Sequence, residues 1–278
     1  MCRNCTYACP WHLFTINEND IFPKIGNQEL CVSCGHCLAV CPTNAIIHKD
    51  FSNNNSHAIN KELIPDFNSV NELFKARRSI RNFLSKQVDK KLIKKAINGA
   101  QFSPSTNNLQ TTKYIVVQDK EIIDSIRKYT TDYIYRTLKY FKNPILRKTY
   151  QLFTKNDPEN IKNMLRDYEG IVNNIDDGND LVLHNPPALL FFYADKKIGF
   201  SDVNAALALQ NATLALFSIG LGSFYAGYVV AAAKSNKRIL KILKLSKDYE
   251  IYGCLAIGYP RLKYDRWIER KKPDIKWY

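Results

Sequence analysis

The spacing of hydrophobic positions changes near residue 50 of this chain. Before that point, short apolar pieces such as Leu13–Ile16 lie among closely spaced cysteines. Beyond it, apolar residues recur at helical spacing over Val70–Ala76 and Lys90–Ala100, which predicts two amphipathic helices. Residues 51–68 are mostly polar and include a run of asparagines, so they predict a linker.

The rest of the chain predicts strands separated by helices. Four apolar runs have the length of strands: Tyr114–Gln118, Ala188–Tyr193, Phe224–Val230 and Ile251–Ile257. Ser201–Ile219 predicts a long core helix, capped at Ser201 or Asp202 and stopped by Gly220. The polar, charged segment from about Lys120 to Val182 predicts further helices, and a Lys-rich helix separates the last two strands. This order favours an α/β or α+β layer.

Seven of the eight cysteines lie within the first 41 residues. A disulfide framework would require export, but the N-terminus lacks the basic, apolar and small-residue pattern of a signal peptide. We therefore expect a cytoplasmic, reducing compartment, in which clustered cysteines indicate metal or redox chemistry. The apolar stretch Val203–Ala233 is interrupted by polar residues and two glycines, which favours a buried helix and strand over a membrane span.

The cysteines form a weak internal repeat. Residues 2–10 read Cys-x-x-Cys-x-x-x-Cys-Pro, and residues 31–42 read Cys-x-x-Cys-x-x-Cys-x-x-x-Cys-Pro. This is the spacing of bacterial ferredoxins with 4Fe–4S clusters, in which the fourth cysteine of a run ligates the other cluster. One complete set of ligands is then Cys9, Cys31, Cys34 and Cys37. The second set, Cys2, Cys5 and Cys41, is one ligand short.

Alternatives stay open for this array. The natural chain could begin upstream and supply a further cysteine two residues before Met1, or the second set could hold a 3Fe–4S cluster or an iron with a non-cysteine ligand. Zinc is another candidate, although it needs neither the third cysteine nor the trailing Cys-Pro. His36 is interpreted as a solvated loop residue, and Cys254, in an apolar strand, as an inert core thiol.

Two polar motifs flank the expected helix Lys90–Ala100. Arg77–Phe83 reads Arg-Arg-Ser-Ile-Arg-Asn-Phe, and arginine forks suit a phosphate because they donate bidentately. Ser103–Gln110 reads Ser-Pro-Ser-Thr-Asn-Asn-Leu-Gln, whose carboxamides and hydroxyls can satisfy the carbonyls and N–H of a flavin ring. Taken alone, the first motif is also compatible with a surface basic cluster and the second with a capping turn.

Taken in order, these two motifs resemble the nitroreductase family of FMN flavoproteins. Asn185–Asp195, Asn204–Gly222 and Ile257–Pro260 resemble the central strand, the core dimer helix and the last strand of that family. With the cysteine array in front, the whole chain resembles ferredoxin-fused nitroreductases of anaerobes. The resemblance implies a dimeric α+β protein. A ferredoxin-like domain would occupy residues 1–50, a linker 51–68, and a nitroreductase-like domain with a mixed sheet flanked by helices 69–278.

The resemblance also implies which residues hold FMN. Its phosphate would be held by Arg77, Ser79 and Arg81, with help from Arg78, and a basic C-terminal contact would come from Arg270 and Lys271. The flavin of the partner subunit would be reached by Pro104, Ser105, Thr106, Asn108 and Gln110. Ala226 and Gly227 would present backbone to the ring nitrogen that exchanges hydride. Thr111-Thr112 replaces the frequent Pro-Trp of the family, and residues 130–180 match nothing in its pattern, so we expect both to affect specificity.

The formal charge of +14 is typical of nucleic-acid binding, but Lys and Arg are spread along the chain and the implied cofactors are anionic. We therefore expect no nucleic-acid partner, and a basic face that steers an acidic electron donor. The second domain has no evident nucleophile–base pair, and His184 is interpreted as structural, so the flavin is expected to do the chemistry.

The favoured function is an oxidoreductase that passes electrons from reduced ferredoxin through the clusters to FMN. A small organic acceptor, such as a nitroaromatic or a quinone, would then be reduced. One alternative is an NAD(P)H-dependent nitroreductase with the clusters as outlet or relic. The missing Gly-x-Gly-x-x-Gly fingerprint argues little against it, because the family binds nicotinamide directly over FMN. The other alternative is a non-enzymatic electron carrier or redox sensor.

Overall fold

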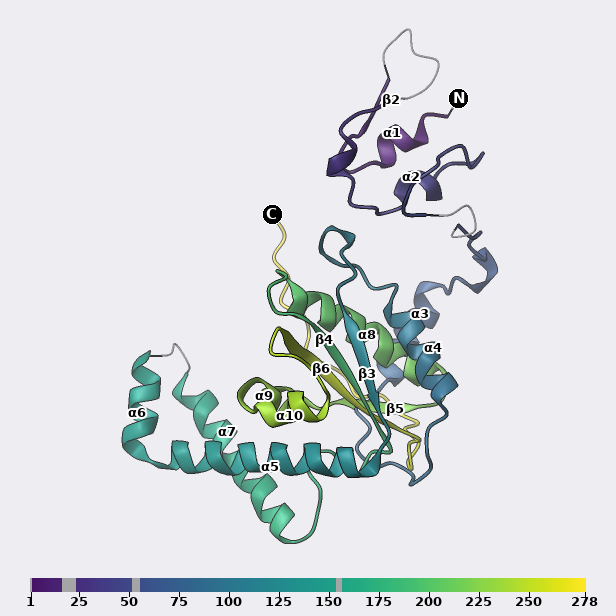
Figure 1. Cartoon of the computed structure of the whole chain (residues 1–278). Coiled ribbons are helices and arrows are strands. Elements are labelled where there is room, and N and C mark those ends of the chain that lie inside the picture. The colour runs from purple at the N-terminus through teal and green to yellow at the C-terminus, as the bar shows by residue number, and fades with distance from the viewer. Residues whose placement is uncertain (1, 17–23, 52–55, 154–156) are drawn as a thin grey trace. The chain divides into compact units, whose positions relative to one another are not determined.

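A computed structural model of the chain describes residues 2–16, 24–51, 56–153 and 157–278. They form two compact units (Figure 1). Unit 1 comprises Met1–Asp66 together with Ser105–Gln110, and unit 2 comprises Phe67–Pro104 and Thr111–Tyr278.

Unit 1 consists of short elements around the cysteines. Helix α1 (Asn4–Ala8) packs against α2 (His36–Ala39), and strands β1 (Phe14–Thr15) and β2 (Lys24–Ile25) pair antiparallel. Three-residue 3-10 helices complete it: η1 (Gln28–Leu30), η3 (Lys61–Leu63) and η4 (Thr106–Asn108). Among the residues described in this unit, Cys9 and Leu13 are the only buried hydrophobic ones. A domain with so small a core depends on a bound metal for stability.

The centre of unit 2 is a four-stranded sheet in the order β3 (Lys113–Val117), β4 (Ala188–Asp195), β6 (Tyr249–Gly258) and β5 (Gly222–Tyr225). All three neighbouring pairs are antiparallel. The expected α+β class is confirmed. A mixed sheet was expected, but the parallel pairing that the described residues contain is an isolated bridge between Ser79 and Ser223.

Helices cover both faces of this sheet (Figure 1). Leu189 and Phe191 pack in one core cluster with α5 (Lys120–Lys142), α9 (Gly227–Ser235) and α10 (Lys237–Ile242). Leu190 and Phe192 pack in the other with α4 (Lys90–Ala100) and α8 (Ser201–Ser218). Successive residues of a strand point to opposite faces, so β4 is apolar nearly throughout. Each of its large side chains contributes roughly 1.5–3 kcal/mol by burial.

Three further helices complete unit 2. Helix α3 (Phe67–Ala76) packs against α8, while α6 (Pro144–Phe153) and α7 (Pro158–Asp176) pack against α5. The expected helical segment from Lys120 to Val182 is thus helical as far as Asp176, within the part that the structure describes. None of the described helices is long and apolar enough to cross a membrane.

Two expected boundaries are wrong. The apolar run Phe224–Val230 is a strand only to Tyr225, and α9 begins at Gly227. Its buried residues, including Val229 and Ala233, recur at helical spacing, and a short apolar run does not by itself distinguish the two states.

The start of α8 also differs from the expected cap. Ser201 is its first helical residue, and its hydroxyl donates to the Ile198 carbonyl at 2.9 Å instead of capping the helix. Gly220 ends this helix as expected. It has φ +79°, and the Leu221 N–H donates to the Leu216 carbonyl at 2.9 Å, as in a Schellman motif.

Candidate functional site

Four cysteines from two segments of unit 1 line one cavity of about 160 Å³: Cys9, Cys31, Cys34 and Cys37. Cys9 directly follows α1, and the other three come from α2 and the loop before it. Much of the remaining wall is apolar and includes Leu13 and Phe14. The fold therefore brings together the four thiols that the cysteine spacing predicts as one complete ligand set.

The four thiols are soft donors, which both zinc and iron–sulfur clusters accept. No three His, Cys, Asp or Glu side chains in the described ranges converge on the position of a single metal ion. A mononuclear zinc site requires its donors at bonding distance from one ion, whereas a cubane cluster takes its thiolates from around a cage. Four thiols around one partly apolar cavity fit the ligand set of an iron–sulfur cluster.

The thiols of this cavity influence one another. Burial raises the pKa of Cys37, and the negative charges of Cys34 and Cys31 raise it further, while backbone N–H groups oppose the rise. Positive charge at the centre of the site relieves such repulsion and holds the ligands as thiolates. His36, expected to be solvated, is exposed at the start of α2.

The cysteines of the incomplete set have more open surroundings. Cys2 is exposed, and Cys5 and Cys41 are half-buried. The Cys41 Sγ accepts the Ala45 N–H at 3.2 Å and lies 3.7 Å from the Thr43 hydroxyl. These hydrogen bonds lower the pKa of Cys41 and so favour its thiolate. Met1, before which a further ligand was considered, lies outside the described residues.

In unit 2, the Arg77–Phe83 motif lies along the ends of β5 and β6. The Ile80 N–H donates to the Ser223 carbonyl at 3.0 Å. Ile80 and Phe83 are buried against backbone, because a Cβ on Gly222 would lie 2.7 Å from Ile80 and one on Gly258 would lie 2.7 Å from Phe83. These two apolar contacts fix the path of the motif.

The arginines of the motif line two cavities. The first, of about 300 Å³, is lined among others by Arg77, Arg78 and Lys263. The second, of about 270 Å³, is lined among others by Arg81, Ala226 and Gly227. Ser79, paired with Ser223, lies between these arginines in the motif. The first cavity is lined by these three cations and by the carboxylate of Asp265, so its wall has the net positive charge that suits a phosphate. The second cavity places a guanidinium with the backbone where α9 begins.

Aromatic rings form much of the second cavity. The Arg81 guanidinium lies 5.5 Å from the centre of the Phe224 ring, and His184 packs edge-on to the same ring at 5.4 Å. A Cβ on Gly227 would lie 3.1 Å from the Tyr225 ring, so a side chain there would crowd the wall. A cationic pocket with an aromatic, backbone-lined neighbour fits the phosphate and the ring of FMN.

His184 was interpreted as structural, but it lines this second cavity. Burial lowers its pKa, the Asp180 carboxylate opposes that shift, and Arg81 adds to it. The sequence around His184 contains no motif that would have identified it, since it reaches the cavity through a loop between α7 and β4.

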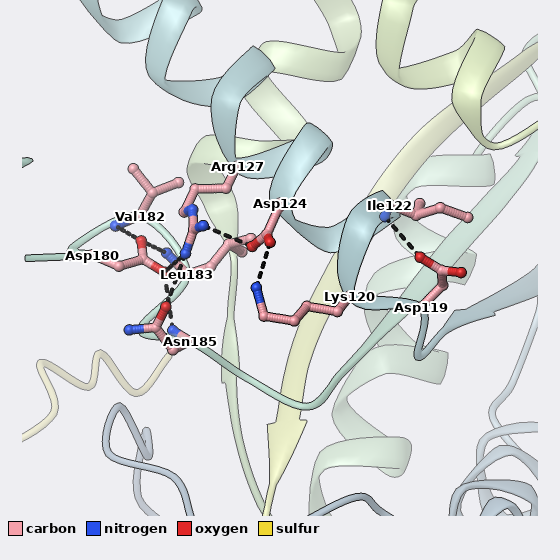
Figure 2. A network of polar contacts seen from close by, with 9 residues as sticks. All are labelled: Asp119, Lys120, Ile122, Asp124, Arg127, Asp180, Val182, Leu183 and Asn185. Atoms are coloured by element: carbon pink, nitrogen blue, oxygen red, sulfur yellow. Dashed lines mark hydrogen bonds and ion pairs between the residues drawn. The ribbon is translucent and has the colours of Figure 1, made fainter. Parts of the chain in front are cut away.

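A polar network holds that loop in place (Figure 2). Asp180, whose side chain is 6% exposed, accepts three backbone N–H groups at 2.9–3.0 Å, those of Val182, Leu183 and Asn185. Arg127 on α5 donates to the Asn185 side chain at 2.8 Å and lies 3.4 Å from the Asp180 carboxylate. His184 and Asn185 keep left-handed backbones, with φ of 59° and 49°. The network therefore fixes the loop that places His184.

The turn expected at the flavin of the partner subunit lines neither of these two cavities. Residues 105–110 group with unit 1, where Asn108 Nδ2 donates to the Ser33 carbonyl at 2.8 Å and Gln110 Nε2 donates to Asn108 Oδ1 at 3.2 Å. Pro104 precedes this turn, and Thr106 begins η4 within it. Ser105 Oγ accepts the Gln110 N–H at 3.0 Å. Their expected contact with the flavin of a partner subunit stays a prediction.

The two basic residues expected near the C-terminus lie in a segment without regular structure. Arg270 and Lys271 are both exposed, and neither lines the two cavities described above. Lys263, which the sequence motifs did not identify, is instead the basic residue of the C-terminal region that lines the first cavity. Cys254 is fully buried in β6, and burial raises its pKa, as expected for an inert core thiol.

Comparison with known protein families gives two matches. Residues 74–259 match the nitroreductase family, and residues 1–45 match the 4Fe-4S dicluster domain. A relative from Archaeoglobus fulgidus, named as an NADH dehydrogenase/NAD(P)H nitroreductase, is 23% identical over 207 residues, which cover 71% of this chain and 90% of the relative. A protein of Hydrogenibacillus schlegelii named Ferredoxin 7Fe is 35% identical over 48 residues, covering 17% of this chain and 58% of the relative.

A solved structure gives the same assignment of fold. The FMN-bound nitroreductase of Desulfitobacterium hafniense aligns with a TM-score of 0.55 at 18% identity, covering 76% of this chain and 100% of its own. At that identity the likeness shows the fold of the larger unit.

Proposed function

This chain belongs to the nitroreductase family and carries a 4Fe–4S dicluster domain in front, and we propose that it passes electrons from reduced ferredoxin through its clusters to FMN. It is an FMN-dependent oxidoreductase. Electron exchange between the clusters and the flavin is supported by one observation above all: the four thiols of a complete cluster site line a single cavity within the same chain as the flavin domain. Clusters of this class reach strongly negative potentials, which suits them to reduce a flavin.

When bound, FMN supplies the redox chemistry by accepting electrons singly and releasing two. The residues of the chain bind and orient it. In the proposal, its phosphate is held by Arg77, Arg78 and Ser79, and its ring by Arg81 with the backbone of Ala226 and Gly227. Lys263 shares the first cavity with Arg77 and Arg78, and so adds positive charge there. Arg270 and Lys271 are kept as candidates for a further phosphate contact.

We assign the working form as a homodimer. Helix α8 buries one face against the sheet but leaves Val203, Leu207 and Phe217 exposed by 48%, 39% and 37%. Burying such side chains against a second copy would release water from apolar surface. The turn that contains Pro104, Ser105, Thr106, Asn108 and Gln110 would then contact the flavin of the partner subunit.

The acceptors proposed are small organic molecules such as nitroaromatics and quinones, reduced in the cytoplasm. A formal charge of +14 supports an acidic donor protein, because complementary fields raise encounter rates. A second candidate donor is NADH or NADPH, favoured by the name of the Archaeoglobus fulgidus relative. In that case the clusters would serve as an outlet.

The test compares donors on protein purified without oxygen. Flavin absorbance is followed in a stopped-flow instrument after mixing with reduced ferredoxin, and separately with NADH or NADPH. The proposal predicts rapid bleaching by ferredoxin and slow or no bleaching by the nicotinamides. Rapid bleaching by a nicotinamide, with none by ferredoxin, would replace it with the second candidate.

A further inference from the structure

One cysteine of the complete cluster site receives a hydrogen bond from a side chain that the proposed function does not use. His48 Nε2 lies 3.3 Å from the Cys31 Sγ. The side chain of His48 is 14% exposed, and the two residues are seventeen positions apart. The contact is therefore produced by the fold of unit 1 and not by a local turn.

The other ring nitrogen determines where the imidazole carries its proton. His48 Nδ1 lies 3.1 Å from the backbone nitrogen of Asp50, and a backbone N–H can only donate. The Asp50 carboxylate is farther from the same nitrogen, at 4.0 Å. A neutral imidazole that accepts at Nδ1 carries its proton on Nε2, which faces Cys31. An iron-bound thiolate has only lone pairs to offer, so His48 is the donor of an N–H···S hydrogen bond.

Neighbouring residues fix the imidazole in this orientation. The Phe51 ring centre lies 5.1 Å from that of His48. Phe51 also covers Gly35, since a Cβ there would lie 3.6 Å from its ring. Ser33, in the loop between Cys31 and Cys34, donates its hydroxyl hydrogen bond to the Asp50 carboxylate. The turn that carries His48 is thus tied to the cysteine loop at two points.

We propose that His48 sets the reduction potential of the cluster held by Cys9, Cys31, Cys34 and Cys37, by donating to Cys31. The inference rests on the ligand set in the proposed function. Reduction adds negative charge to a cluster, and hydrogen bonds to its sulfurs stabilise that charge and raise its potential. His48 is a positioning residue that acts through Cys31. It makes this cluster easier for a donor to reduce than the same cluster without the hydrogen bond.

Two substitutions separate the hydrogen bond from the turn that supports it. His48→Asn retains an oxygen near the place of Nδ1 to accept the Asp50 N–H, but its shorter side chain does not reach Cys31. His48→Gln places an amide N–H near the position of Nε2. The matched control is His36→Gln, because His36 is exposed and adjoins Cys37.

Redox titrations of the full-length protein, followed by electron paramagnetic resonance, test the proposal. We expect His48→Asn to shift one cluster to a more negative potential, His48→Gln to recover part of that shift, and His36→Gln to cause none. Equal potentials for wild type and His48→Asn, or equal shifts for the Asn and Gln variants, would overturn the proposal.

A second measurement does not depend on how the variants fold. Wild-type protein labelled with [15N]histidine should show a histidine nitrogen coupled to the reduced cluster by electron spin-echo spectroscopy, and His36→Gln should retain that coupling. Its absence would contradict the proposal even if His48→Asn lost its iron. Iron analysis of the wild type tests the proposed function separately, because a chain that binds no cubane cluster would lack the iron that the proposed function requires.

Discussion

The two units position their binding residues by different means. In unit 1, Cys31, Cys34 and Cys37 lie within seven consecutive residues, and little apolar surface is buried around them. In unit 2, segments 77–81, 181–184 and 224–228 are far apart in the sequence and are brought together by a buried sheet. The cluster site therefore depends on its metal to become rigid, whereas the flavin cavities are built by protein packing before any cofactor binds.

The largest expected effect is loss of the cluster in unit 1. Cys34→Ser removes one thiolate from the complete set, so that cluster should be absent and amide protection should fall across residues 24–51, with unit 2 unchanged. Iron analysis and hydrogen exchange measure the two effects. The matched control, Cys254→Ala, changes a buried thiol in β6 and should keep the iron. Full iron content in Cys34→Ser would remove that residue from the ligand set.

The next effect concerns flavin binding. Each charge-assisted hydrogen bond is worth about 1.5–3 kcal/mol, so Arg77→Ala, which removes a phosphate contact, combined with Arg81→Ala, which removes a ring contact, should weaken FMN binding by about 100-fold or more. The iron content should stay intact. Fluorescence titration of released FMN measures the affinity. Arg166→Ala is the control, because that side chain is 74% exposed on α7 and should leave binding unchanged. Retained affinity in the double variant would show that the FMN site is misassigned.

A smaller effect tests the packing that fixes the arginine motif. In Gly222→Ala the new methyl group would meet Cγ1, Cβ and Cγ2 of Ile80 at 2.7–2.9 Å, so we expect a loss of about 1–3 kcal/mol in the free energy of unfolding. Gly170→Ala, in α7, has no atom within 4 Å of the new Cβ and should gain about 0.5–1 kcal/mol. Urea unfolding of the two variants gives both numbers. Equal changes in the free energy of unfolding for the two variants would contradict the close contact between Gly222 and Ile80.

The network in Figure 2 allows a similar paired test. Arg127→Met leaves the Asn185 side chain without a donor and removes the cation 3.4 Å from Asp180, so it should lower the free energy of unfolding by about 1–2 kcal/mol. Lys120→Met breaks an ion pair in which the lysine is 86% exposed, and should cost less than about 0.5 kcal/mol. The same urea measurement compares them, and a larger cost for Lys120→Met would contradict the role of the network.

The smallest effect is a dependence of stability on pH. Because burial lowers the pKa of His184 in the folded state, the unfolded chain binds this proton more readily. Neutral His184 therefore contributes stability that is lost as the pH falls below the pKa of histidine in the unfolded chain, about 6.5. The loss is complete once the pH is below the pKa of His184 in the folded protein. His184→Gln should reduce the difference in unfolding free energy between about pH 7.5 and pH 5.5. An unchanged difference in His184→Gln would contradict the assigned cause.

The same comparison explains what could be predicted from the sequence. Ligand spacing is a local pattern, so the array of Cys31, Cys34 and Cys37 could be predicted directly from the sequence. The end of the long helix could also be predicted, because Gly220 stops it. The alternating elements left α/β and α+β both open, and the α+β class was implied by the resemblance to the nitroreductase family. His184 and Lys263 could not be found in this way, because only the sheet and the Arg127 network place them at the cavities.

The errors have a related cause. Phe224–Val230 is apolar throughout, and a change from strand to helix within such a run depends on which neighbours it packs against. The Ser201 hydroxyl donates to the Ile198 carbonyl in the preceding turn, and this contact overrides the preference of serine for the N-cap position. The hydrogen bond from His48 to Cys31 spans seventeen residues and likewise has no local pattern.

In the proposed function, electrons reach FMN through the cluster in unit 1. The most direct test is a single-turnover measurement of flavin bleaching by reduced ferredoxin, made without oxygen on wild type and on Cys34→Ser, with dithionite as the reductant that bypasses the clusters. We expect ferredoxin to bleach the wild-type flavin but not that of Cys34→Ser, and dithionite to bleach both. Equal rates with ferredoxin in the two proteins would contradict it.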